Sequence, residues 1–81
     1  MARYFFHLRD HESSIFDEEG VDLADLSAVQ MTALKAARDT LSHDMKAGFI
    51  DLRYRIEVED VEGTVVHTLP LKDAFVIRQA T

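Results

Sequence analysis

The sequence predicts an α+β domain with β-β-α-β-β order, in which one long helix packs on one face of a four-stranded antiparallel sheet. Residues 26–48 carry apolar side chains at the helical period and form the one long stretch that does so. Residues 51–59 alternate between apolar and charged side chains, as a strand with one buried face does. We expect the strand order 2-1-3-4, because it joins the elements without a crossing.

Signals at both ends define the long helix. Ser27 is a good N-cap, and Gln30 three residues later completes a capping box. Gly48 follows the last turn, where a residue with positive φ is commonly found. At about 100° per residue, the apolar side chains gather on one face that should pack on the sheet. This face contains Leu26, Ala33, Leu34, Ala37, Leu41 and Met45.

The N-terminal stretch predicts two strands joined by a polar turn. Residues 3–9, RYFFHLR, form the first strand, and residues 14–17 form a short second strand. Aromatic side chains occur on both faces of the first strand. A strand with one solvent-exposed face would be expected to carry them on its buried face alone. We therefore expect Phe5 to project from a face that water would otherwise cover.

A second hairpin is predicted after the helix. Residues 51–59 form the third strand and residues 64–69 the fourth, with Gly63 at a left-handed position in the turn between them. Pro70 has no amide to donate, so the fourth strand either ends there or becomes an edge strand. Residues 72–78 fit either one helical turn or a few extended residues. The predicted core contains Tyr4, Phe6, Leu8, Phe16, Leu34, Ala37, Leu41, Tyr54, Ile56 and Val58.

Length and composition indicate one globular domain that spans residues 1–81. The hydrophobic content of 47% is ordinary for a folded protein. The sequence has no Cys, which excludes disulfides and thiolate sites. No apolar run is long enough for a signal peptide or a membrane span, so we expect a cytoplasmic protein without a membrane partner. The formal net charge of −6 argues against a general nucleic-acid binder.

No residue pattern indicates catalysis. The serines lack a nucleophile-elbow context, and the glycines are too few for a phosphate-binding loop. The four histidines do not show the spacing of metal ligands. Residues 17–25 carry five carboxylates, but their spacing does not match an EF-hand, and a solvated acidic loop before a helix explains them. We expect a non-enzymatic protein without a catalytic residue, cofactor or specific metal site.

Two motifs resemble a family of short bacterial proteins known only as a domain of unknown function. They are RYFFHLRD at residues 3–10 and DEEGVDL at residues 17–23. Residues 55–74 fit the same family pattern of strand, acidic turn with Gly, strand and Pro-containing exit. The resemblance implies no activity, cofactor or catalytic residue. A looser likeness to the partner-binding domain of HicB-type antitoxins implies protein binding, although the Pro and Gly landmarks of that domain's loop are absent.

The outer face of the sheet is the remaining candidate for function. If the first and third strands are neighbours, aromatic and arginine side chains gather there, as in protein interfaces and homodimers. Such a face can also stack single-stranded bases, and a solvated face with internal ion pairs is a third interpretation. We favour self-association or a protein partner and keep single-stranded nucleic acid as the alternative. The candidate interface is Arg3, Phe5, His7, Arg9, Arg53 and Arg55.

Overall fold

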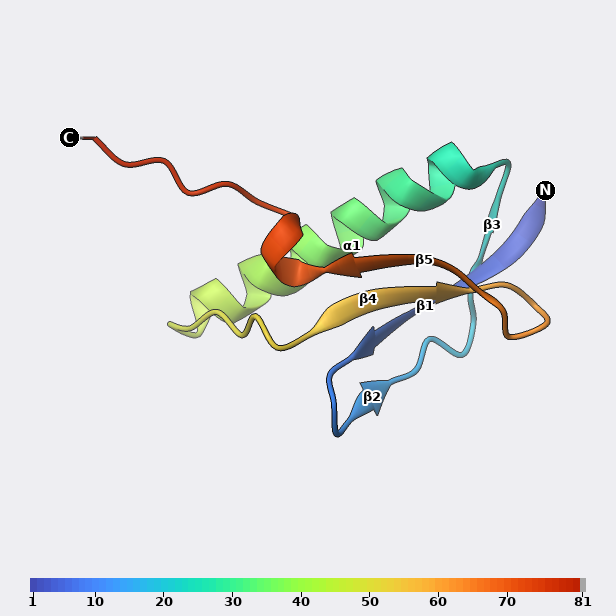
Figure 1. Ribbon diagram of the computed structural model, residues 1–81, viewed down its shortest axis with the longest axis horizontal. Coiled ribbons are helices and arrows are strands. Elements are labelled where there is room, and N and C mark those ends of the chain that lie inside the picture. Colours follow the sequence, from blue (N-terminus) through green and yellow to red (C-terminus); the bar gives the residue numbers. More distant parts are fainter. Residues whose placement is uncertain (81) are drawn as a thin grey trace.

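The computed structural model describes residues 1–80 and consists of one long helix on an open antiparallel sheet (Figure 1). This confirms the predicted α+β class. The short 3-10 helix η1 follows the last strand directly. The elements in chain order are β1 (Ala2–Arg9), β2 (Ser14–Ile15), β3 (Val21–Leu23), α1 (Leu26–Lys46), β4 (Arg55–Glu59), β5 (Val65–Pro70) and η1 (Leu71–Asp73).

The sheet has five strands, so the predicted count of four is wrong. Its main path is β2-β1-β4-β5, and β3 pairs with β1 off this path. In the pairing of β3 with β1, Val21 aligns with Tyr4 and Leu23 with Ala2. These β1 residues precede Phe5, the first residue of β1 that pairs with β4. The predicted order therefore lacks β3. Its three residues are too few to show a period of two, so the pairing depends on a distant partner that the local sequence does not reveal.

β4 begins at Arg55, four residues later than the alternation predicted. The carboxylate of Asp51 accepts hydrogen bonds from both the amide and the guanidinium of Arg53, which closes a turn before the strand. Leu52 lies in this turn and is 46% exposed. The assignment of residues 51–54 to a strand is therefore wrong, because a local side-chain hydrogen bond competes there with sheet pairing.

The N-terminus of α1 is capped by Asp25 and not by the predicted Ser27. Asp25 has extended backbone angles, and its Oδ1 accepts the amide of Ala28 at 2.8 Å. Asp and Ser are both good N-cap residues. The helix begins directly after Asp25, the earlier of the two, because β3 ends only two residues before it. At the other end Gly48 has φ of 95°, as expected. No helix in residues 1–80 combines the length and apolar character that a bilayer crossing requires.

The core lies where α1 crosses β4 and β5 (Figure 1). Small side chains at Ala33 and Ala37 are fully buried and let the helix approach the sheet closely. The prediction that Phe16 belongs to the core is wrong, because Phe16 is 61% exposed and lies on the opposite face of the sheet. The other predicted residues are buried or packed against the core. The fully or largely buried apolar residues are Val29, Ala33, Ala37, Leu41, Ile56, Val58, Leu71 and Ala74.

Candidate functional site

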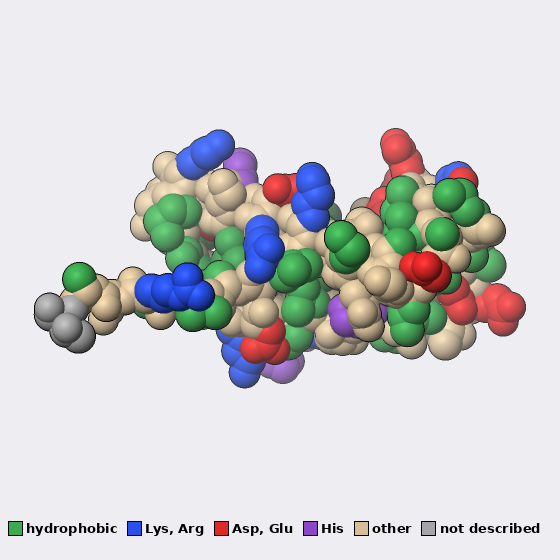
Figure 2. Space-filling view, turned by 90° about the horizontal axis from the view of Figure 1, so that it is seen from above, with side chains coloured by type: hydrophobic (Ala, Val, Ile, Leu, Met, Phe, Trp, Pro, Cys, Tyr) green, Lys and Arg blue, Asp and Glu red, His purple; other side chains and the backbone are tan. Residues whose placement is uncertain are grey.

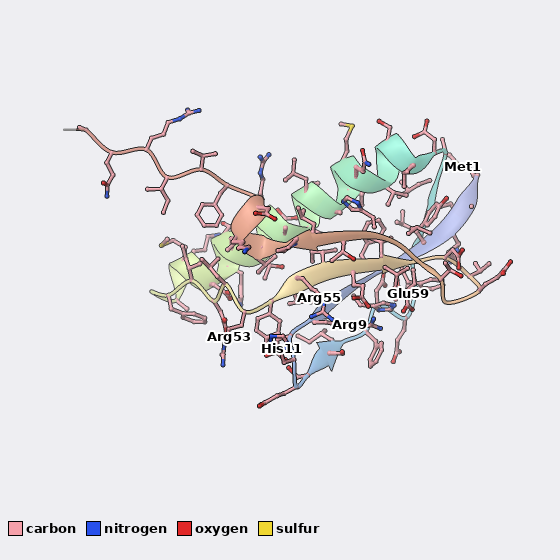
Figure 3. The ribbon with its side chains drawn as sticks, in the orientation of Figure 1. Met1, Arg9, His11, Arg53, Arg55 and Glu59 are labelled. Atoms are coloured by element: carbon pink, nitrogen blue, oxygen red, sulfur yellow. The ribbon has the colours of Figure 1, made fainter. Side chains whose placement is uncertain are left out.

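Four of the six predicted interface residues share the face of the sheet that turns away from α1. On β1 these are Phe5, His7 and Arg9, and β4 contributes Arg55, which aligns with Arg9. Figure 3 shows Arg9, Arg55 and Glu59 along this face. Phe5 is only partly exposed, contrary to expectation, because its ring packs against Gly20.

The other two predicted residues, Arg3 and Arg53, lie at the margins of this group. Arg3 pairs with Asp22 of β3, with Nε at 3.0 Å from Oδ1. Arg53 lies in the turn before β4, where it pairs with Asp51 at 2.8 Å (Figure 3). Arg3 lies beside Phe5, because Cγ of Arg3 and Cε1 of Phe5 would be 3.0 Å and 2.9 Å from a Cβ at Gly20. Arg53 lies outside the strands.

The arginines of the outer face are engaged with carboxylates of the same face. Arg9 contacts Glu57 and lies 3.4 Å from Glu59, and Nε of Arg55 lies 3.2 Å from Glu57. Burial alone would raise the pKa of Glu57, but hydrogen bonds from Arg55 and Arg9 outweigh this, so its pKa is lowered. The positive charge of the face is thus largely offset internally.

His7 is buried at the centre of this network. Its Nδ1 accepts the backbone amide of Asp17 at 3.1 Å, so the proton lies on Nε2, which faces Oε1 of Glu59 at 3.1 Å. Phe16 covers the ring edge-on at a centroid distance of 5.4 Å, and the guanidinium of Arg9 lies 5.4 Å from the Phe16 ring. Both ring nitrogens are therefore occupied by structural contacts.

The acidic loop also has a structural role. The carboxylate of Asp17 accepts the amides of Phe6, Glu19 and Gly20 at 3.0–3.2 Å. The amide of Phe6 lies between the parts of β1 that pair with β3 and with β2, so Asp17 satisfies a donor that neither strand reaches. Burial alone would raise the pKa of Asp17, but these three hydrogen bonds bring it below its usual value.

A groove of about 600 Å³ lies between the C-terminal half of α1 and the segment that follows η1. Arg38 joins its two walls, because its Nε donates to the carbonyl oxygen of Ala74 at 2.8 Å. Met45 and Val76 line the groove and are 56% and 76% exposed. The apolar lining residues are Leu41, Met45, Ile50, Ala74, Phe75 and Val76.

The sequence alone does not identify this groove. The helical period puts Leu41 and Met45 on the apolar face of the helix, which predicts core packing but not a groove. The second wall comes from residues 72–78, which fit a helical turn and an extended segment equally well. The signal available is the apolar run Ala74 to Ile77, which follows a Pro that ends the sheet.

Residues 3–72 match the family model of a domain of unknown function, DUF6894. The chain belongs to the DUF6894 family. No curated protein and no solved structure shows significant similarity to it. The DUF6894 match includes His7, Asp17 and Gly20, which the structure brings together, and the helical wall of the groove. The wall formed by residues 73–78 lies beyond the matched range. The likeness to HicB-type antitoxins stays a prediction.

Proposed function

We propose that this DUF6894 chain is a non-enzymatic interaction module that binds another copy of itself or a protein partner through the C-terminal groove. The supporting observation is the gathering of exposed apolar side chains around that groove. Besides the lining residues, Phe49 and Ile77 are 54% and 75% exposed. Single exposed apolar side chains scattered over a protein surface are normal. A cluster of neighbouring exposed apolar side chains is typical of an interaction site.

The outer face of the sheet supports this proposal less well than the groove does. The arginines on that face, Arg9 and Arg55, are in ion pairs, and Phe5 is partly covered by the loop at Gly20. Single-stranded nucleic acid on this face would have to displace carboxylates from both arginines. The net charge of −6 also opposes long-range attraction of a polyanion.

A non-catalytic role agrees with the state of the titratable side chains. His7, the buried histidine, uses both ring nitrogens for contacts within the fold. Asp17 has its two carboxylate oxygens bound to three amides. A general acid or base needs an atom that can reach a substrate, and neither residue offers one in this arrangement.

Light scattering and affinity capture test the proposal with Met45→Asp, which places a charge in the apolar groove. Wild type should show a concentration-dependent mass, or should retain a partner from its native cell extract, and Met45→Asp should lose that association. Met31→Asp is the matched control, since Met31 is an exposed methionine of the same helix outside the groove. Association that survives Met45→Asp, or is lost equally in Met31→Asp, would contradict the groove as the binding site.

A further inference from the structure

The ion pairs are unevenly distributed over the molecule. The arginines of β1 and of the β4 region, Arg3, Arg9, Arg53 and Arg55, each contact a carboxylate. Among residues 1–80, by contrast, Arg38, Lys46 and Lys72 have no carboxylate within 4.0 Å. These cations belong to the two elements that frame the C-terminal groove.

Cations contribute to the lining of the groove. Arg38 and Arg78 line it directly. Lys46 of α1 and Lys72 of η1 are not among the lining residues. Asp73 is the carboxylate among the described lining residues. On the face that Figure 2 displays, basic side chains lie toward the end with the C-terminal segment, and acidic ones gather at the opposite end.

We propose that the groove binds an apolar segment of a partner protein that carries Asp or Glu residues beside its apolar side chains. This inference rests on the proposed function and names the chemistry of the partner. Leu41, Met45 and Ile50 would contact the apolar side chains of the partner. Arg38 and Arg78 would pair with its carboxylates. In a protein of net charge −6, a groove lined by two arginines is a local exception that favours an acidic ligand.

The hydrogen bond from Arg38 supports this arrangement. Its Nε is used by the carbonyl oxygen of Ala74, so the side chain is fixed across the groove. Its terminal nitrogens have no carboxylate partner within residues 1–80 and can bind one from a ligand in the bidentate geometry that guanidinium groups favour. An anionic membrane is less suitable, because the site is concave and the whole molecule is negative.

Binding of the full chain to two pools of immobilised peptides tests the inference. Both pools carry Leu, Ile or Phe at the apolar positions, and the polar positions are all Glu in one pool and all Lys in the other. Wild type should be retained by the Glu pool at least about tenfold more strongly than by the Lys pool, and salt should weaken this retention. Amide shifts in NMR spectra with the Glu pool should centre on Met45, Ile50 and Ala74.

Charge reversal in the lining of the groove should exchange the preference for the two peptide pools. Arg78→Glu, which reverses a charge in the lining, should weaken retention on the Glu pool and strengthen it on the Lys pool, by about tenfold or more in each direction. Lys35→Glu is the matched control, because Lys35 is an exposed cation of α1 that pairs with Asp39 and does not line the groove. The control should bind as wild type does.

Three outcomes would overturn the inference. One is equal retention on both pools, and another is no binding to either. The third is binding to vesicles of phosphatidylserine and phosphatidylcholine in place of the Glu peptides. If Met45→Asp abolishes self-association while no peptide binds, the groove takes a second copy, and the proposed function stands without this partner chemistry. If groove variants change no association at all, both proposals fail.

Discussion

Asp17 and His7 are joined by a hydrogen bond of 3.1 Å from the backbone amide of Asp17 to Nδ1 of the buried ring. The side chain of Asp17 turns back to the same strand and accepts the amide of Phe6 at 3.1 Å. The loop that links β2 to β3 is therefore fastened to β1 by both its backbone and its carboxylate. The motifs RYFFHLRD and DEEGVDL form one structural unit through these contacts.

Replacing Asp17 with Asn should destabilise the fold, although the two side chains have nearly the same size and shape. In Asp17, Oδ1 accepts the amides of Glu19 and Gly20, and Oδ2 accepts the amide of Phe6. Asn has one oxygen, so its NH₂ group must face a donor on one of the two sides. We expect a loss of about 1–3 kcal/mol in the free energy of unfolding, measured by urea denaturation. Glu18→Gln, on an exposed neighbour, serves as the control. Equal stability of the Asn variant and wild type would refute this role of the carboxylate.

The stability of the fold should fall in acid. Asp17 and Glu57 have pKa values below their usual range, since hydrogen bonds outweigh the effect of burial, and hydrogen bonds from Arg53 lower the pKa of Asp51 to about 2. A carboxyl whose pKa is lower in the folded state stabilises the fold above its unfolded pKa of about 4, and loses that contribution as the pH falls through the folded pKa.

Urea midpoints measured between about pH 7 and about pH 2.5 check this expectation. The difference in urea midpoint between wild type and Asp17→Asn should become smaller at low pH. A protonated Asp17 carries a hydrogen that must face an amide, as the NH₂ group of Asn does. A constant gap across the pH range would mean that Asp17 does not contribute to the acid sensitivity.

Gly20 should be the least replaceable glycine. It has φ of 71°, and a Cβ at this position would lie 2.9 Å from Cε1 of Phe5 and 2.9 Å from the carbonyl oxygen of Tyr4. Gly63 has φ of 82°, but a Cβ there would meet nothing within 4 Å, so this position isolates the backbone cost. We expect Gly20→Ala to lower the unfolding free energy by about 1–3 kcal/mol more than Gly63→Ala does. Thermal denaturation of the two variants measures the difference, and equal midpoints would contradict the close approach.

Leu71→Ala should be among the most damaging core substitutions. Leu71 is fully buried, and its amide donates to the carbonyl oxygen of Tyr54 at 3.1 Å. The lost side chain should cost about 2–5 kcal/mol, in the range expected for Leu41→Ala. Leu52→Ala is the control, since Leu52 lies exposed in the turn before β4, and it should change stability by less than about 0.5 kcal/mol. Similar midpoints for Leu71→Ala and Leu52→Ala would show that η1 does not belong to the core.

The elements that the sequence predicts well are those with a local physical cause. In the helix, apolar residues recur at the helical period over many turns. In the turn between β4 and β5, Gly63 has φ of 82°, and its amide donates to the carbonyl oxygen of Asp60. β1 begins one residue before the predicted strand, and β5 is shifted by one residue at each end. In each of these cases the determining residues are neighbours in the chain.

The features that the sequence does not predict depend on distant partners. β3 exists because Val21 to Leu23 pair with β1, and Leu71 is buried because η1 folds back against α1. The groove needs two walls that lie far apart in the chain, so no motif within either wall identifies it. Phe16 is apolar but covers His7 on the outer face, and its hydrophobicity alone could not show which side of the sheet it takes.

The strand directions determine how the fold would respond to mechanical load. β1 and β5 both pair antiparallel to β4, so they run in the same direction, and the chain enters and leaves this part of the sheet at opposite ends (Figure 1). A pulling force between Ala2 and Pro70 would act along the strands and strain the hydrogen bonds on both sides of β4 in shear, many at once. Such an arrangement resists extension far better than one in which the bonds open singly.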